Sequence, residues 1–267
     1  HKPFQALMKK VVKWGSIIVL VSALLITLLT LLFYFPPFQN WAVKQASAYA
    51  SQKMGMQISV GSVRLSFPLN LDLREVKVLE PNRKTKNLND TVADISSMVA
   101  DVQLLPLLRK QVMVDELVFN DMKVNTTHFI DNVCIKGNVG HMSLKAHGID
   151  LSREHVQLND ALLKNANIIV ELSDTVPPDT TPSENFWKIN LDKLKLQNSA
   201  LAVHMPGDSL SVKTIFTNAL ATQAYFDLYK GLYTVRHIDW GNGGLQYDRN
   251  FEPTTRGFDY NHLLLTD

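Results

Sequence analysis

The chain has 267 residues, enough for one or two ordinary domains, and its formal net charge is only +2. Charged residues make up 19% of it and the mean hydropathy is −0.03. The chain is therefore apolar for a soluble protein and lacks the charge excess that nucleic acid would attract. A single cysteine, Cys134, excludes an intrachain disulfide and a cysteine-based metal cluster.

An apolar run without a charged residue, 14–35, predicts a membrane-spanning helix. It would rise about 33 Å as a helix, close to the roughly 30 Å hydrocarbon core of a bilayer. Basic residues precede this run and none follows before Lys44, so the positive-inside rule places the tip, 1–13, in the cytoplasm. A cleaved signal peptide is the alternative, but the run is long and no small-x-small site follows it. The flanking residues expected at the two membrane surfaces are Lys9, Lys10, Lys13, Trp14 and Tyr34.

Residues 36–55 predict a short amphipathic helix beyond the membrane, which the proline pair PP separates from the apolar run and Gly55 terminates. Two interpretations are compatible with it. The helix could lie at the membrane-water boundary as a connector, or it could cap the open end of a sheet that follows.

From residue 56 onward the chain alternates apolar and polar residues, as strands with one apolar face do. The alternation in VRLSFPLNLDL, 63–73, is out of phase with that before Gly61, and such resets indicate bulges or turns. LLPLL, 104–108, predicts a turn or short helix at the sheet edge. The segment 81–90 predicts a polar loop.

A loose repeat follows, in which short apolar alternations are interrupted by Asn or Asp. We read these interruptions as polar turns and GNGG, 241–244, as a hairpin turn. SDTVPPDTTPSE, 173–184, reads as a loop within one continuous array, although it could be mistaken for a linker. We expect 56–267 to be the start of a repetitive sheet domain that continues beyond residue 267.

No segment after residue 55 has a helical pattern long enough to cover this sheet. An apolar face without a covering layer must curl on itself, dimerise or hold an apolar ligand. The residues expected to line such a face are Val63, Leu65, Phe67, Leu69, Leu71, Leu73, Leu117, Phe119, Val156, Leu158, Ile168, Val170, Ile189, Leu191, Leu194 and Leu196.

Signatures of catalysis and cofactor binding are missing. The sequence has no GxSxG elbow, no HExxH and no phosphate loop, and its eight histidines are scattered. His141 and His147 could share a strand face, but no third ligand accompanies them. The expectation is no enzyme, no metal and no cofactor, although a truncated chain could lack its catalytic part.

The order of these parts resembles the TamB family of AsmA-like proteins, which are similar to the chorein-type bridge-like lipid transfer proteins. The resemblance rests on the anchor ending FYFPPFQNW, the helix ending KMGMQISVG, the strand SVRLSFPLNLDLREVKV and the later stretch DTTPSENFWKINLDKLKLQNSALAVHMPGDS. It implies a mainly β fold. A transmembrane helix and a short amphipathic helix would precede a long curled antiparallel sheet, open on one side and lined with apolar residues.

The resemblance also implies a location and a function. The protein would be a single-pass inner-membrane protein of a Gram-negative cell, with its bulk in the periplasm, carrying phospholipid as cargo toward the outer membrane. An alternative is a scaffold or chaperone that assembles outer-membrane β-barrel proteins. In both, a BamA- or TamA-type barrel would be the partner, bound through a C-terminal part that is absent here. A bare structural spacer would have no reason to keep one face apolar.

Overall fold

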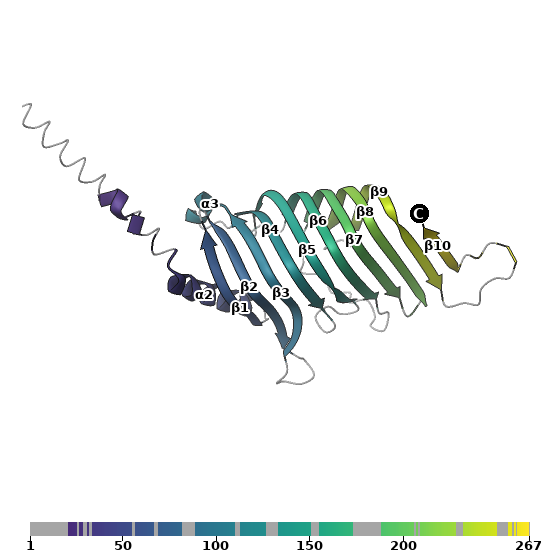
Figure 1. Ribbon diagram of the computed structural model, residues 1–267, viewed down its shortest axis with the longest axis horizontal. Coiled ribbons are helices and arrows are strands. Elements are labelled where there is room, and N and C mark those ends of the chain that lie inside the picture. The colour runs from purple at the N-terminus through teal and green to yellow at the C-terminus, as the bar shows by residue number, and fades with distance from the viewer. Residues whose placement is uncertain are drawn as a thin grey trace, which may run out of the picture.

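The structure is a computed structural model. It describes residues 21–25, 27–28, 31, 34–54, 57–66, 69–81, 89–109, 113–126, 133–150, 155–172, 188–205, 207, 209–227, 232–249, 256–257, 259 and 261–266. The helices α2 and α3 and ten strands form over these residues, and the described residues between 21 and 31 are also helical (Figure 1). In chain order they are α2 (Pro36–Met54), β1 (Gln57–Ser66), β2 (Asn70–Pro81), β3 (Asn89–Val102), α3 (Leu104–Leu108), β4 (Met113–Asn125), β5 (Val133–Asp150), β6 (His155–Leu172), β7 (Lys188–Met205), β8 (Leu210–Asp227), β9 (Leu232–Arg249) and β10 (His262–Thr266).

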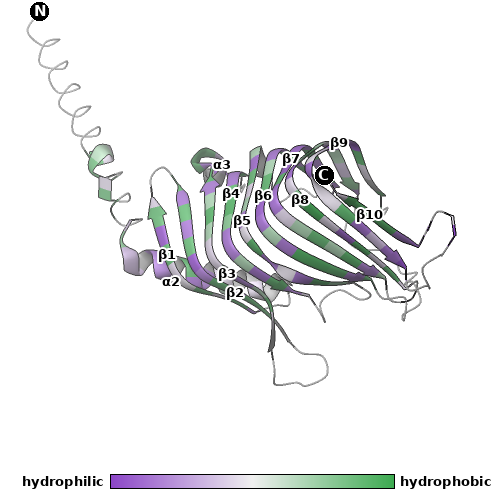
Figure 2. Cartoon of the chain, turned by 45° about the vertical axis from the view of Figure 1, so that its right-hand side comes forward, coloured by the Kyte–Doolittle hydropathy of each residue, from purple (hydrophilic) through white to green (hydrophobic). Residues whose placement is uncertain are grey.

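The strands form one sheet in which each strand lies beside its predecessor in the chain, from β1 to β10. Figures 1 and 2 show this sheet as a long curled surface without a second layer of helices or strands over the described strands. The prediction of a mainly β, open, curled sheet is confirmed at this level.

One pair of neighbours departs from the predicted antiparallel arrangement. β6 and β7 run parallel, with His155 beside Lys188 and Glu171 beside His204. The predicted segment 173–184 separates them in the chain and lies outside the described residues. Alternation cannot predict this step, since it fixes which face a side chain takes and not the direction of the strand. The sheet continues directly from β6 to β7, so the segment joins neighbouring strands of one sheet.

Helix α2 lies along the first edge of the sheet, against β1. Two side chains of α2 accept hydrogen bonds from backbone N–H groups on the free side of β1. Gln39 Oε1 accepts from Leu65 N at 3.2 Å, and Ser51 Oγ accepts from Ile58 N at 2.9 Å. The helix therefore caps the edge strand, which agrees with one of the two interpretations drawn from the sequence and leaves the other open.

The predicted membrane span, 14–35, lies largely outside the described residues, as do the tip 1–13 and Lys9, Lys10, Lys13 and Trp14. The described part, 21–25, 27–28 and 31, is helical, and its large apolar side chains are exposed. Thr27 Oγ1 donates to Ala23 O at 2.8 Å, so this hydroxyl is satisfied within the helix. A search of the described residues for a helix long and apolar enough to cross a membrane finds none.

Several predicted turns are wrong, because the chain continues through them as long strands. Strands β5 to β9 each span 18 residues. The predicted hairpin at 241–244 lies within β9, and the NAN and QNS stretches lie within β6 and β7. The Asn and Gly residues in these stretches adopt a special backbone conformation without reversing the chain.

That conformation produces a crease across the sheet. Glu75, Asp121, Asn165, Asn198 and Gly241 have φ between 45° and 57°, in the left-handed region. They lie near the middle of β2, β4, β6, β7 and β9. The strand register aligns these positions along one line across the sheet, either beside one another or separated by one residue of an intervening strand. Asn and Gly are suited to this conformation, because a left-handed backbone crowds most side chains.

The crease also explains the reset of alternation at Gly61. Gly61 lies opposite Glu75, and a Cβ at Gly61 would collide with the Glu75 side chain. In β1 the exposed and half-buried positions alternate up to Gly61 and resume one residue later, so two exposed residues are adjacent. The apolar residues of both halves of each strand therefore share one face despite the change of phase. The register is unbroken across Gly61, with one residue of β1 opposite one of β2, so the predicted bulge or turn is wrong at this position.

A candidate apolar groove

The candidate site is the face of the sheet that carries the apolar residues, which we call the groove face. Its strand pairing aligns apolar side chains in rows that cross the whole sheet. One row runs through nine strands and contains only apolar residues. Its members are Leu65, Leu71, Ala100, Leu117, Leu144, Ala161, Leu194, Ala221 and Ile238.

A second unbroken row lies two residues nearer the crease and crosses eight strands. Its members are Val63, Leu73, Met98, Phe119, Met142, Leu163, Leu196 and Ala219. Paired residues on neighbouring strands have side chains on the same face and in contact range. The two rows therefore form a continuous apolar band along the length of the sheet.

Beyond the crease the apolar band continues. A third row extends from β1 to β10 and is apolar except at Gly137 and Thr214. Its members are Ile58, Val78, Ala93, Val124, Gly137, Ile168, Leu201, Thr214, Leu245 and Leu265. A Cβ at Gly137 would collide with the backbone of Asn167 and Ile168, so the gap in this row is set by close strand packing.

The groove face is concave. Its core cluster includes Val114, Leu158, Leu191 and Ala224, from strands β4 to β8, all of them at least 93% buried. No second layer covers the described strands, so such burial comes from curvature, which packs side chains of the same face against one another. Most other members of the rows are half-buried and remain accessible from the open side.

The predicted lining residues can now be placed. Fifteen of the sixteen lie on described residues, and Phe67 lies outside them. The register and the shared buried cluster together assign all fifteen to the groove face. Val156 and Ile189 are neighbours near one rim, and Val170 pairs with Val203 near the other. Leu69, Val156, Leu158 and Leu191 are buried, and the other eleven are half-buried. Tyr34, the described member of the predicted anchor flank, is half-buried.

Sequence reasoning missed about half of the lining. Met98, Met142, Leu163 and Ala219 complete the second row, and Ala100, Leu144, Ala161, Ala221 and Ile238 complete the first. The methionines stand beside polar neighbours and the alanines are small, so neither stands out in a pattern of large aliphatic residues. Counting every apolar residue in phase with Leu117 or Leu163 would have found them.

The opposite face, which we call the outer face, has a different chemistry beside the crease. A row of nine polar residues runs parallel to the apolar rows, with Asn120 Oδ1 and His141 Nδ1 in contact at 2.7 Å. Its members are Ser62, Arg74, Ser97, Asn120, His141, Lys164, Gln197, Asn218 and Asn242. Arg74 also forms an ion pair with Asp72 at 2.8 Å, and the Arg74 side chain is exposed to solvent.

The two edges of the sheet also differ. Helix α2 covers the β1 edge, whereas β10 pairs only with Gly244–Asp248 of β9. The first half of β9 therefore pairs with β8 but with no described strand along its other edge. Leu232, Val235 and Ile238 are exposed in this half. Unpaired strand edges with apolar side chains are sites where another strand can add.

The described residues hold no cluster of three or more His, Cys, Asp or Glu able to bind a metal. Two polar groups stand out near the groove rim at the end of β8. Asp227 is 1% exposed, and Tyr225 donates its hydroxyl to Asp227 Oδ2 at 3.2 Å. Burial, followed by this hydrogen bond and the Asp227 charge, raises the pKa of Tyr225 above its ordinary value.

Comparison with known proteins identifies no relative: the chain matches no family of known sequences, no curated protein and no solved structure.

Proposed function

We propose that this chain is part of a membrane-anchored conduit that carries phospholipid along its groove face. The observation that carries the proposal is the first apolar row, which crosses nine strands without a polar member. An isolated domain would cover such a face with a second layer. Here the concave face is half-buried and open, with the shape and polarity that acyl chains need.

The physics of the face suits transport better than tight, selective binding. Each buried CH₂ contributes about 0.8 kcal/mol, so an acyl chain would be held by many weak contacts. These contacts have no preferred direction, and neighbouring positions along a row are chemically alike. A chain can therefore slide from strand to strand over small barriers, while its headgroup stays in water at the open side.

The N-terminal segment supports an anchor at one end of this conduit. The exposed helical residues Val21, Leu24, Leu25 and Leu28 are apolar, and a helix with such a surface is stable in lipid. The positive-inside rule then places the sheet on the non-cytoplasmic side, which in a Gram-negative cell is the periplasm. Transport toward the outer membrane, with a BamA- or TamA-type barrel as partner, completes the proposal.

Site-specific photo-crosslinking in intact cells tests the conduit. Probes at Leu71 of β2 and Leu117 of β4 lie on the groove face, and probes at Arg64 of β1 and Val118 of β4 lie on the outer face. We expect phospholipid adducts from the groove-face probes alone. Equal lipid capture by both faces, or capture of proteins without lipid by Leu71 and Leu117, would reject the conduit.

A second function is favoured by the open half of β9. An extended segment of another protein could pair with this edge, with its apolar side chains beside Leu232, Val235 and Ile238. This would make the sheet a scaffold or chaperone for outer-membrane β-barrel proteins. Probes at Thr234 and Arg236 should then capture unfolded barrel proteins, whereas a pure lipid conduit should capture none there.

A further inference from the structure

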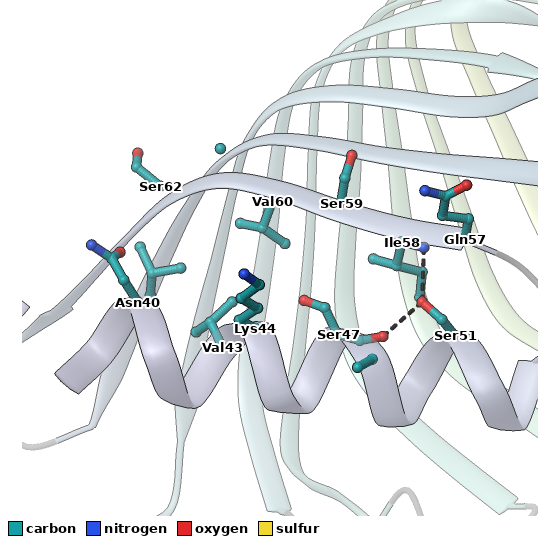
Figure 3. A pocket seen from close by; sticks show the side chains of 13 residues that line it. Asn40, Val43, Lys44, Ser47, Ser51, Gln57, Ile58, Ser59, Val60 and Ser62 are labelled. Carbon is teal, nitrogen blue, oxygen red and sulfur yellow. Dashed lines mark hydrogen bonds between the residues drawn. The ribbon is translucent and has the colours of Figure 1, made fainter. Parts of the chain in front are cut away.

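The hollow between helix α2 and strand β1 is the most distinctive cavity outside the groove. Its volume is about 480 Å³ (Figure 3). One side of α2 forms one wall, with Asn40, Lys44 and Ser47 turned toward the strand. The segment 57–63 of β1 forms the other wall.

Two hydrogen bonds hold the helix to the strand at the ends of this hollow, from Leu65 N to Gln39 and from Ile58 N to Ser51. Backbone N–H groups of an edge strand point outward at alternate residues. Allowing for the change of phase at Gly61, Val60 and Val63 therefore direct their N–H groups toward the hollow. Between its two attachments, the capped edge offers hydrogen-bond donors.

The strand wall of the hollow is amphipathic. Ile58 and Val60 belong to the groove face, and in Figure 3 their side chains point toward α2. Ser59 and Ser62 belong to the outer face and point away from α2. A molecule in the hollow would therefore meet apolar side chains of the strand and the polar side chains that α2 turns toward it.

The charge of the hollow is set by Lys44. This side chain is exposed, and no carboxylate among the described residues forms an ion pair with it. The Glu75 side chain lies against Gly61 of the strand wall. One ammonium, the Ser47 hydroxyl and outward N–H groups are donors that match the acceptor oxygens of a phosphate.

We propose that this hollow binds the phosphate headgroup of a glycerophospholipid, with Lys44 as the main phosphate contact and the acyl chains passing Val43 and Val60 into the groove. This inference rests on the proposed function and adds the headgroup class and the place of binding. The hollow, which we call the slot, lies along α2, whose first residue, Pro36, follows the apolar helical residues described between 21 and 31. A lipid leaving a membrane at that point would meet the slot before the rest of the groove.

The test measures lipid loading of the full chain, purified in detergent, with two probes that share acyl chains. Phosphatidylglycerol carries the phosphate, and diacylglycerol lacks it. We compare Lys44→Gln with Lys195→Gln, an exposed lysine on the outer face of β7. Lys44→Gln should weaken phosphatidylglycerol loading about tenfold, equivalent to about 1.4 kcal/mol, and leave diacylglycerol loading unchanged.

A second variant guards against an indirect effect of removing Lys44. Ser47→Asp places a negative charge on the helix wall of the slot and should lower phosphatidylglycerol loading without affecting diacylglycerol. The matched control is Ser96→Asp, at an exposed position on the crease.

The outcomes separate the slot from the conduit. If the chain loads both lipids and neither Lys44→Gln nor Ser47→Asp changes their ratio, the slot proposal is rejected and the conduit stands. Equal weakening of both lipids would also reject phosphate recognition at Lys44. If the unaltered chain loads neither lipid, the conduit and the slot both fall.

Discussion

The two faces of the sheet are built from the same strands, yet they differ in how their side chains are organised. On the groove face, Leu117 belongs to a row that is apolar over nine strands. On the outer face its neighbour Val118 is in a row that mixes apolar, polar and charged residues, including Asp72 and Lys195. Apolar residues therefore occur on both faces, but only the groove face keeps them in register. Continuity, more than composition, distinguishes a surface that can guide a lipid.

The largest expected effect comes from interrupting that continuity. Leu117→Asp places a carboxylate among half-buried apolar side chains, where an unpaired charge is unfavourable. We expect a loss of about 2–4 kcal/mol in the free energy of unfolding by guanidinium titration and a loss of lipid loading. Val118→Asp, the adjacent outer-face control, should cost about 1 kcal/mol or less and keep lipid loading. Similar behaviour of the two variants would mean that the faces are functionally equivalent.

A smaller effect is expected at the crease, which holds the two halves of the groove face together. Asn165 has φ of 53° and is exposed in β6. Asn165→Val forces a β-branched residue into the left-handed region, which should cost about 1–3 kcal/mol. Asn167→Val, at an exposed position two residues further along β6, should change stability by about 0.5 kcal/mol or less.

Glycine at the same position sharpens this comparison. Asn165→Gly should retain the stability of the unaltered chain, because glycine adopts a positive φ without strain. If Asn165→Gly and Asn165→Val are equally destabilised, backbone conformation is not what Asn165 provides.

The smallest expected effect lies at the rim, where the faces meet solvent. The raised pKa of Tyr225 means that its neutral form is favoured in the folded chain. The corresponding stabilisation is present below the ordinary tyrosine pKa, about 10, and is lost as pH rises above that value. Ultraviolet titration should therefore show one phenol ionising after the others, and Tyr225→Phe should remove that late step. A late step that persists in Tyr225→Phe would assign it to another tyrosine.

Much of the groove face could be predicted from the sequence, because alternation fixes the face of each side chain. The segment 63–73 illustrates this: its apolar positions that the structure describes all lie on the groove face. The reset at Gly61 was visible in the sequence, but its cause was not: the two strands keep one residue opposite one residue there, and the left-handed backbone of Glu75 changes the phase without a bulge.

Other features could not be read from local patterns. Asn165 and Asn198 look like turn residues, because the left-handed conformation serves both a turn and a crease. What separates the two is pairing with neighbouring strands, which is a property of the whole sheet. The cap formed by Gln39 and Ser51 depends on distant N–H groups, so no helical pattern could reveal it.

The strand order has a consequence for how the chain acquires its structure. Each strand pairs with the one before it, and the only covered edge belongs, within the described strands, to the first. Sheets whose contacts join successive segments can grow by adding one segment at a time. A chain emerging from a membrane with α2 and β1 first could therefore fold progressively, using each completed strand as the template for the next. This growth must wait at the parallel step from β6 to β7. Because the two strands are parallel, the start of β7 lies beside the start of β6, and the chain must first cross back over the full length of β6.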